Sequence, residues 1–223
     1  MNEFAAIFDM DGVLVDSYWP HYQAWKEMAK RYDLPITEER FATAFGKTGH
    51  DFVKELWGDI IKEQDIPALD AEKEELYREV LRADFPAMKG VCDLIKSLHE
   101  AGYAMAIGSS GAPGNIQVVL ECLPNAEMFA ATVNGFEVTK GKPDPDIFLT
   151  AAGKLGVEPR NAAVIEDSPV GIEAAKAAGM VAVAITGTAE RKNLAEANII
   201  VDWMMELSPQ LISLLIENNR RKG

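Results

Sequence analysis

The stretch Phe4-Ala5-Ala6-Ile7-Phe8-Asp9-Met10-Asp11-Gly12-Val13-Leu14 decides the fold predicted for this chain. An apolar run of strand length ends in two aspartates one residue apart, and a glycine follows at once. Side chains alternate along an extended strand, but a turn that begins at Met10 brings both carboxylates toward one point. Two such acids suit a hard cation, and one of them can act as a nucleophile. An acidic turn after a strand is also common without any function, so the rest of the chain must decide.

The composition is that of a folded, acidic chain of 223 residues. Hydrophobic residues make up 48%, enough for a substantial core and unlike a disordered chain. The formal net charge of -13 makes nucleic acids and anionic membranes poor partners. Both cysteines lie in helical apolar patterns, which favours buried thiols and a reducing compartment. With no signal-peptide pattern and no apolar run of membrane-spanning length, we expect a cytoplasmic protein.

Strand and helix patterns alternate from residue 87 to the end of the chain. Such alternation predicts an α/β fold with a doubly wound parallel sheet and helices on both of its faces. The opening strand joins the same sheet, so the core is predicted to comprise residues 1–16 and 87–223. The apolar runs that predict the other strands lie at residues 103–108, 130–133, 162–165, 181–185 and 199–201.

Residues 17–86 follow a different pattern, that of an inserted all-helical domain. Apolar residues recur there at helical spacing, first from Trp25 to Tyr32 and later over residues 53–60, with no convincing strand between them. The segment Gly46-Lys47-Thr48-Gly49-His50 is predicted to break the helical pattern.

Polar side chains follow three strands of the predicted sheet. In open parallel sheets, ligands bind beyond the carboxyl ends of the strands, where these side chains gather. Carboxylates crowded at one edge raise one another's pKa unless a cation is present, and Mg²⁺ prefers oxygen ligands. A phosphate would complete such a site, with the metal, Lys142 and Ser109 each near one of its oxygens. The polar strand ends are Asp9 and Asp11, Ser109 and Ser110, and Glu166 and Asp167.

Four motifs, in this order and at these separations, resemble those of the haloacid dehalogenase superfamily. They are Asp9-Met10-Asp11-Gly12, the strand end at Ser109, Lys142 in Gly141-Lys142-Pro143-Asp144-Pro145, and Glu166-Asp167-Ser168. The inserted helices resemble the small cap of the group that contains β-phosphoglucomutase and many sugar-phosphate phosphatases. A histidine at the position of His21, in the first helix of the insert, also resembles that group.

The resemblance implies a role for each motif residue. Asp9 resembles the nucleophile that becomes an aspartyl-phosphate, and Asp11 resembles the general acid/base whose backbone carbonyl also binds the metal. Ser109 and Lys142 resemble the phosphate-binding pair. An aspartate at the position of Asp11 separates the phosphoryl-transfer members from the dehalogenases, so phosphate chemistry is expected. The implied Mg²⁺ site comprises Asp9, Asp11, Glu166 and Asp167, with Asp167 the safer direct ligand.

Candidate substrate-binding residues lie in two parts of the chain. Ser110 and Gly111 follow the serine strand end, whereas His21, Lys47 and Thr48 lie in the helical insert. The two basic candidates also have plainer interpretations. Lys47 can be a solvated side chain in a glycine-flanked loop, and His21 a histidine of the helix surface.

The expected function is a magnesium-dependent phosphatase that acts on a small phosphorylated metabolite. The alternatives are a hexose phosphate mutase of the β-phosphoglucomutase type, an inorganic pyrophosphatase and, less favoured, a non-catalytic binding protein. Related mutases place an arginine in the cap loop and a lysine after the serine motif, where this chain has Gly49 and Ala112. Hydrolysis is therefore favoured over the mutase reaction. A monomer is expected because a small cap can enclose the site within one chain.

Overall fold

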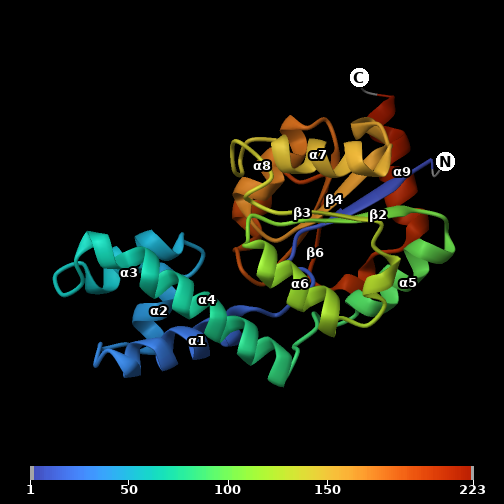
Figure 1. The fold of residues 1–223 in the computed structure, drawn as a ribbon. Coiled ribbons are helices and arrows are strands. Elements are labelled where there is room, and N and C mark those ends of the chain that lie inside the picture. The colour runs from blue at the N-terminus through green and yellow to red at the C-terminus, as the bar shows by residue number, and fades with distance from the viewer. Residues whose placement is uncertain (1–2, 222–223) are drawn as a thin grey trace. The chain divides into compact units, whose positions relative to one another are not determined.

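The computed structural model describes residues 3–221, which fall into two compact units. The core unit comprises Met1–Asp16 and Ala87–Gly223, and the helical unit comprises Ser17–Pro86. The core unit is a parallel sheet between layers of helices, and the helical unit has no strand among its described residues (Figure 1). The predicted fold class is therefore confirmed. Among residues 3–221, no helix is long and apolar enough to cross a membrane.

The sheet of the core unit contains six parallel strands in the order β3-β2-β1-β4-β5-β6. β1 pairs with both β2 and β4, so that Ile7 lies opposite Ala106 on one side and Val164 on the other. The order of the strands reverses at β1, which is where open sheets of this kind bind ligands. The strands are Ala5–Phe8 (β1), Ala104–Gly108 (β2), Ala131–Val133 (β3), Ala162–Glu166 (β4), Val181–Ile185 (β5) and Ile199–Val201 (β6).

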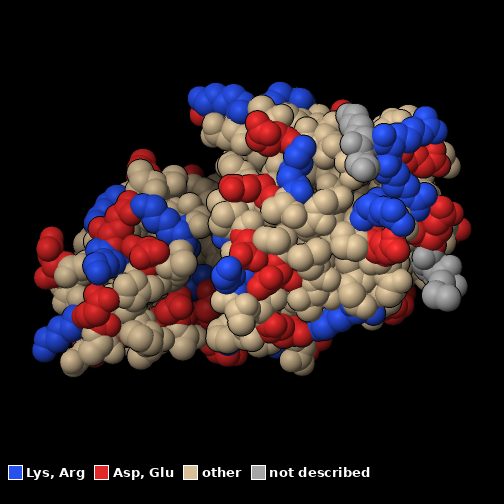
Figure 2. Space-filling view, turned by 90° about the horizontal axis from the view of Figure 1, so that it is seen from above, with Lys and Arg blue, Asp and Glu red and all other residues tan. Residues whose placement is uncertain are grey.

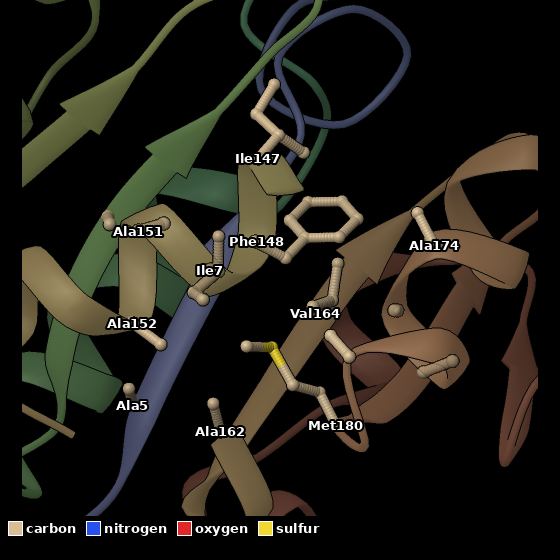
Figure 3. Packing of buried hydrophobic residues seen from close by; sticks show 14 of the residues in the cluster. Ala5, Ile7, Ile147, Phe148, Ala151, Ala152, Ala162, Val164, Ala174 and Met180 are labelled. Atoms are coloured by element: carbon tan, nitrogen blue, oxygen red, sulfur yellow. The ribbon is translucent and has the colours of Figure 1, made fainter. Parts of the chain in front are cut away.

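Helices cover both faces of this sheet, which explains why β1, β4 and β5 are buried along their whole length and apolar except for Glu166 at the end of β4. In Figure 1, α7 and α8 lie on one face, and α5 and α6 lie on the other. Phe148 of α7 packs beside Ile7 and Val164 in the buried cluster under the first face (Figure 3). The helices of this unit are Val91–Glu100 (α5), Pro113–Cys122 (α6), Asp146–Leu155 (α7), Pro169–Ala177 (α8) and Pro209–Arg220 (α9).

The helical unit has an aromatic interior, in which Trp25 stacks on Phe52 with ring centroids 4.1 Å apart. The helical stripe predicted over residues 53–60 is only partly right. α3 ends at Trp57, and Ile60 lies beyond it with 60% of its surface exposed. The predicted break is also shorter than expected, because Gly49 is already the first residue of α3. The helices are Tyr18–Arg31 (α1), Glu38–Ala44 (α2), Gly49–Trp57 (α3) and Ile66–Ala83 (α4).

Candidate active site

The predicted site residues of the core unit gather where three adjacent strands end. Asp9 follows β1, Ser109 follows β2, and Glu166 is the last residue of β4. The backbone N–H of Asp9 still donates to the carbonyl of Ile165 at 3.0 Å, so the ladder between β1 and β4 extends to the first aspartate. Strand pairing therefore fixes Asp9 and Glu166 on neighbouring strands.

A tight turn after Asp9 folds the second aspartate back toward the same edge. The carbonyl of Met10 accepts hydrogen bonds from the N–H groups of residues 13–15, and Gly12 has a φ of +75°. A Cβ atom on Gly12 would lie 1.9 Å from Oδ2 of Asp167 and 2.8 Å from Oγ1 of Thr188. Position 12 thus requires glycine both for its left-handed backbone and for the close approach of Asp167.

Three buried carboxylates form the centre of the site. Ligand oxygens of Asp9, Glu166 and Asp167 all lie within 4.8 Å of one another, and these residues are 8%, 1% and 5% exposed. Lys142 reaches them from the loop before α7. Its Nζ donates to Oδ1 of Asp9 at 2.5 Å and to Oε1 of Glu166 at 2.7 Å. One ammonium group therefore faces three carboxylates.

Burial and the unequal charges shift the pKa of every group in this cluster. Burial, together with the charges of Glu166 and Asp11, raises the pKa of Asp9 to about 7 against the opposing effect of Lys142. Burial and the charges of Glu166 and Asp9 also raise the pKa of Asp167 well above its ordinary value. Burial opposes the charged forms of Glu166 and Lys142, but Lys142 lowers the pKa of Glu166, and the carboxylates of Asp9 and Glu166 raise the pKa of Lys142. The positive charge of Lys142 therefore does not offset the burial and mutual repulsion of Asp9 and Asp167.

Glu166 differs from the two aspartates because its second oxygen is fully engaged. Oε2 accepts hydrogen bonds from the N–H groups of Asp167 and Ser168, both at 2.8 Å, and from the hydroxyl of Ser168 at 2.9 Å. A Cβ atom on Gly171 would lie 1.8 Å from Oε1 of Glu166. The first turn of α8 therefore has room for this carboxylate only because position 171 is glycine. Glu166 therefore holds Lys142 and the start of α8 in place.

The loop after β2 supplies the predicted phosphate-binding groups. Ser109 is buried, and its Oγ accepts a hydrogen bond from the N–H of Gly111 at 3.0 Å. Its backbone N–H donates to the carbonyl of Val133, which ties this strand end to β3. Ser110 and Gly111 follow in the same loop, before α6 begins at Pro113.

The remaining candidates belong to the helical unit. Nδ1 of His21 accepts a hydrogen bond from Nζ of Lys73 at 2.9 Å, and its ring stacks on Tyr77 with centroids 3.9 Å apart. Lys47 forms an exposed ion pair with Glu55. Thr48 caps α3 by accepting a hydrogen bond from the N–H of Asp51 at 3.2 Å.

Sequence reasoning missed two residues that contact the candidates. Thr188 follows β5, and its Oγ1 lies beside Gly12 on the same side as Oδ2 of Asp167, where its side chain opposes the rise in the pKa of that carboxyl group. The polar run Thr186-Gly187-Thr188 at a strand end was the available signal. Lys73 lies in α4, where it is 4% exposed although its neighbours in sequence are mostly charged. Its partner His21 is 52 residues away, so no local pattern indicated the contact.

Comparison with known proteins identifies the family of this fold and site. The family model of haloacid dehalogenase-like hydrolases matches residues 5–179. The chain belongs to the haloacid dehalogenase-like hydrolases. The family resemblance and the prediction of a hydrolase are thereby confirmed.

Several members of this hydrolase family are similar to the chain over most of its length. A β-phosphoglucomutase of Bacillus subtilis is 32% identical over 217 residues, which cover 93% of each chain. A fructose-1-phosphate phosphatase of Escherichia coli is 33% identical over 177 residues, covering 79% of this chain and 93% of that protein. The crystal structure of a family IA, variant 3 hydrolase from Entamoeba histolytica has a TM-score of 0.85 at 30% identity, with 96% and 100% coverage.

Proposed function

We propose that this protein is a metal-dependent phosphatase that hydrolyses the phosphate ester of a sugar or a similar small metabolite. The observation that carries the proposal is the buried cluster of Asp9, Glu166 and Asp167 facing the single cation of Lys142. The similarity to a fructose-1-phosphate phosphatase supports the same class of substrate.

The residues of this cluster fit a Mg²⁺ ion. Mg²⁺ is commonly held by one or two carboxylates and retained waters, and burial and the neighbouring carboxylates raise the pKa values of Asp9 and Asp167. Asp9, Asp167 and the carbonyl of Asp11 would hold the ion, and Glu166 would keep Lys142 beside it. A bound Mg²⁺ supplies positive charge that offsets the repulsion between an attacking carboxylate and a phosphate.

In the proposed reaction, an oxygen of Asp9 attacks phosphorus, and the bond between phosphorus and the organic oxygen breaks. Asp11 gives its proton to that leaving oxygen. A water molecule then attacks phosphorus of the aspartyl-phosphate while Asp11 takes a proton from it. The acyl phosphate bond breaks, which regenerates Asp9 and releases inorganic phosphate. Ser109 and Lys142 bind the phosphate oxygens through both steps.

A hexose phosphate mutase is the second candidate, favoured by the similarity to the β-phosphoglucomutase of Bacillus subtilis. Glycine at position 49 and alanine at position 112 count against it, since neither supplies a cation for a second phosphate. Lys47 is a poor substitute for the missing cations, because it already forms an ion pair with Glu55.

A panel of phosphate esters tests the proposal. The panel contains sugar phosphates, pyrophosphate and a chromogenic ester, each with and without Mg²⁺, and the Asp9→Asn variant serves as the control for contaminating phosphatases. We expect Mg²⁺-dependent release of phosphate from at least one sugar phosphate. Release from none of the esters would refute the proposal. Conversion of β-glucose 1-phosphate to glucose 6-phosphate with a bisphosphate primer would establish the mutase instead.

We also propose that the active species is a monomer in the cytoplasm. Light scattering after size-exclusion chromatography tests the first part of this proposal. A molar mass near 24.4 kDa is expected, and a mass twice as large would contradict it.

A further inference from the structure

The loop between β3 and α7 carries an exposed aromatic ring, and its backbone contacts the loop after β2. Phe136 is 80% exposed, more than any other large hydrophobic side chain in the described part of the chain. Its neighbour Gly135 lies directly against the loop after β2. The N–H of Gly135 donates to the carbonyl of Gly111 at 3.3 Å, and a Cβ atom on Gly135 would lie 2.5 Å from the carbonyl oxygen of Ser110.

This contact places Phe136 one residue away from the predicted phosphate-binding loop. Consecutive Cα atoms are about 3.8 Å apart, so the backbone of Phe136 cannot lie far from Ser110 and Gly111. Position 135 must be glycine for the approach, since any side chain would meet the Ser110 backbone. The backbone that carries the exposed ring is therefore held beside the predicted phosphate-binding loop by its neighbour Gly135.

Hydrogen bonds also hold this loop in one conformation. Oδ1 of Asn134 accepts from the N–H of Phe136 at 2.9 Å, and Oε1 of Glu137 accepts from both the N–H and the side-chain amide of Asn134. Lys154 of α7 pairs with Glu137 and donates to the carbonyl of Thr132 at 2.7 Å. The loop is thus preorganised, although an exposed phenylalanine contributes little hydrophobic stabilisation to the fold.

We propose that Phe136 determines substrate specificity by contacting the carbon face of the substrate's organic part. This inference rests on the proposed phosphatase function. Sites for small molecules combine aromatic side chains with a few placed polar groups, and the polar groups here are those that bind the phosphate. One face of a sugar or polyol carries carbon-bound hydrogens, which can pack against an aromatic ring. The ring should therefore strengthen binding of an ester but not of inorganic phosphate.

Steady-state kinetics with two variants test the proposal. Phe136→Ala removes the ring, and Leu149→Ala removes another exposed apolar side chain from α7 as the matched control. With the sugar phosphate that the wild type hydrolyses best, Phe136→Ala should raise KM about tenfold with little change in kcat. Its inhibition constant for inorganic phosphate and its Tm should remain those of the wild type, and Phe136→Tyr should restore KM.

An unchanged KM in Phe136→Ala, or an equal loss of affinity for inorganic phosphate, would overturn the proposal. If the wild type hydrolyses no ester, the phosphatase function itself fails. Calorimetric binding of fructose 1-phosphate and of inorganic phosphate to the wild type and Phe136→Ala then decides the role of the ring. Weaker binding of the sugar phosphate alone would support it, and equal binding by both proteins would contradict it.

Discussion

Each unit of the protein buries a group of charged side chains, and the two groups are built differently. In the helical unit, Lys73 lies 2.6 Å from the carboxylate of Glu74 and over the rings of Trp25 and Tyr77, at 5.2 and 5.3 Å. One cation there meets the Glu74 carboxylate, a ring nitrogen of His21 and two aromatic faces, which also attract cations. In the core unit, Lys142 faces the three carboxylates of the candidate active site.

The difference shows which buried charges point to a function. A balanced pair among aromatic rings can be part of the packing of a domain. An excess of buried carboxylates is costly because each one opposes the ionisation of the next. The face seen in Figure 2 has no such excess of one charge, since acidic and basic side chains are interspersed over it. In the core unit, the excess lies at the edge of the sheet where the order of strands reverses, and a bound cation would offset it.

Asp9→Asn should have the largest effect on activity. The amide cannot attack phosphorus, so turnover should fall by several orders of magnitude. The Tm of the metal-free protein should stay the same or rise, because one of the crowded carboxylates is gone. Phosphate release and thermal melting measure the two effects. Asp59→Asn, at an exposed position of the helical unit, is the matched control and should change neither. A large loss of stability in Asp9→Asn would contradict the view that this cluster is costly to the fold.

Replacing each buried lysine by methionine compares the two groups directly. Lys142→Met should reduce activity roughly 10²–10³-fold, as for loss of a group that stabilises transition-state charge. It should also enlarge the stabilisation by Mg²⁺, because the carboxylates then have no other cation. Lys73→Met should cost about 1–3 kcal/mol of stability because Glu74 and His21 each lose a hydrogen bond to Nζ, with no change in the response to Mg²⁺. Melting curves with and without Mg²⁺ separate the two, and equal responses would remove the distinction.

The third prediction concerns pH and metal together. The pKa of Asp9 is raised to about 7, and that of Asp167 is raised as well, so the fold favours their protonated forms. That contribution to stability is complete below the ordinary carboxyl pKa and is lost as pH rises through about 7. Mg²⁺ binds the ionised forms, so its addition should raise Tm by several degrees near pH 8 and by much less near pH 5. A shift independent of pH would contradict the assignment of these carboxylates to the metal.

The sequence predicted the sheet, the insert and the polar strand ends because each has a local signature. Apolar runs such as Val181–Ile185 agree with the observed strand end to end. The parallel sheet then brings Asp9, Glu166 and Asp167 together without further information.

Contacts between distant residues had no such signature. The hydrogen bond from Lys73 to His21 depends on the packing of α1 against α4, and the contact of Thr188 with Asp167 depends on the path of a loop. The helical stripe of α3 was extended too far, to Ile60, because apolar residues after the helix end at Trp57 continue the same spacing. Packing decides such cases, and a single sequence does not encode it locally.

The smallest expected effect belongs to Thr48, which caps α3. Thr48→Ala should cost about 0.5–2 kcal/mol of stability, the usual value for a lost N-cap. Thr37 caps α2 in the same way, through the N–H of Arg40 at 3.3 Å, so Thr37→Ala is the matched control and should lose a similar amount. Chemical denaturation measures both. A rise in KM for Thr48→Ala alone would show that Thr48 also has the substrate-binding role predicted from sequence.

The most direct test of the account is to trap the phosphoenzyme. Asp11→Asn keeps the nucleophile but lacks the group that protonates the leaving oxygen and activates water, so its turnover should fall roughly 10²–10⁴-fold. After addition of a substrate with a good leaving group, intact-protein mass spectrometry should show one added phosphoryl group on Asp11→Asn. The Asp9→Asn variant should show none under the same conditions. A phosphoryl group on Asp9→Asn, or full activity of that variant, would contradict the assignment of Asp9 as the nucleophile.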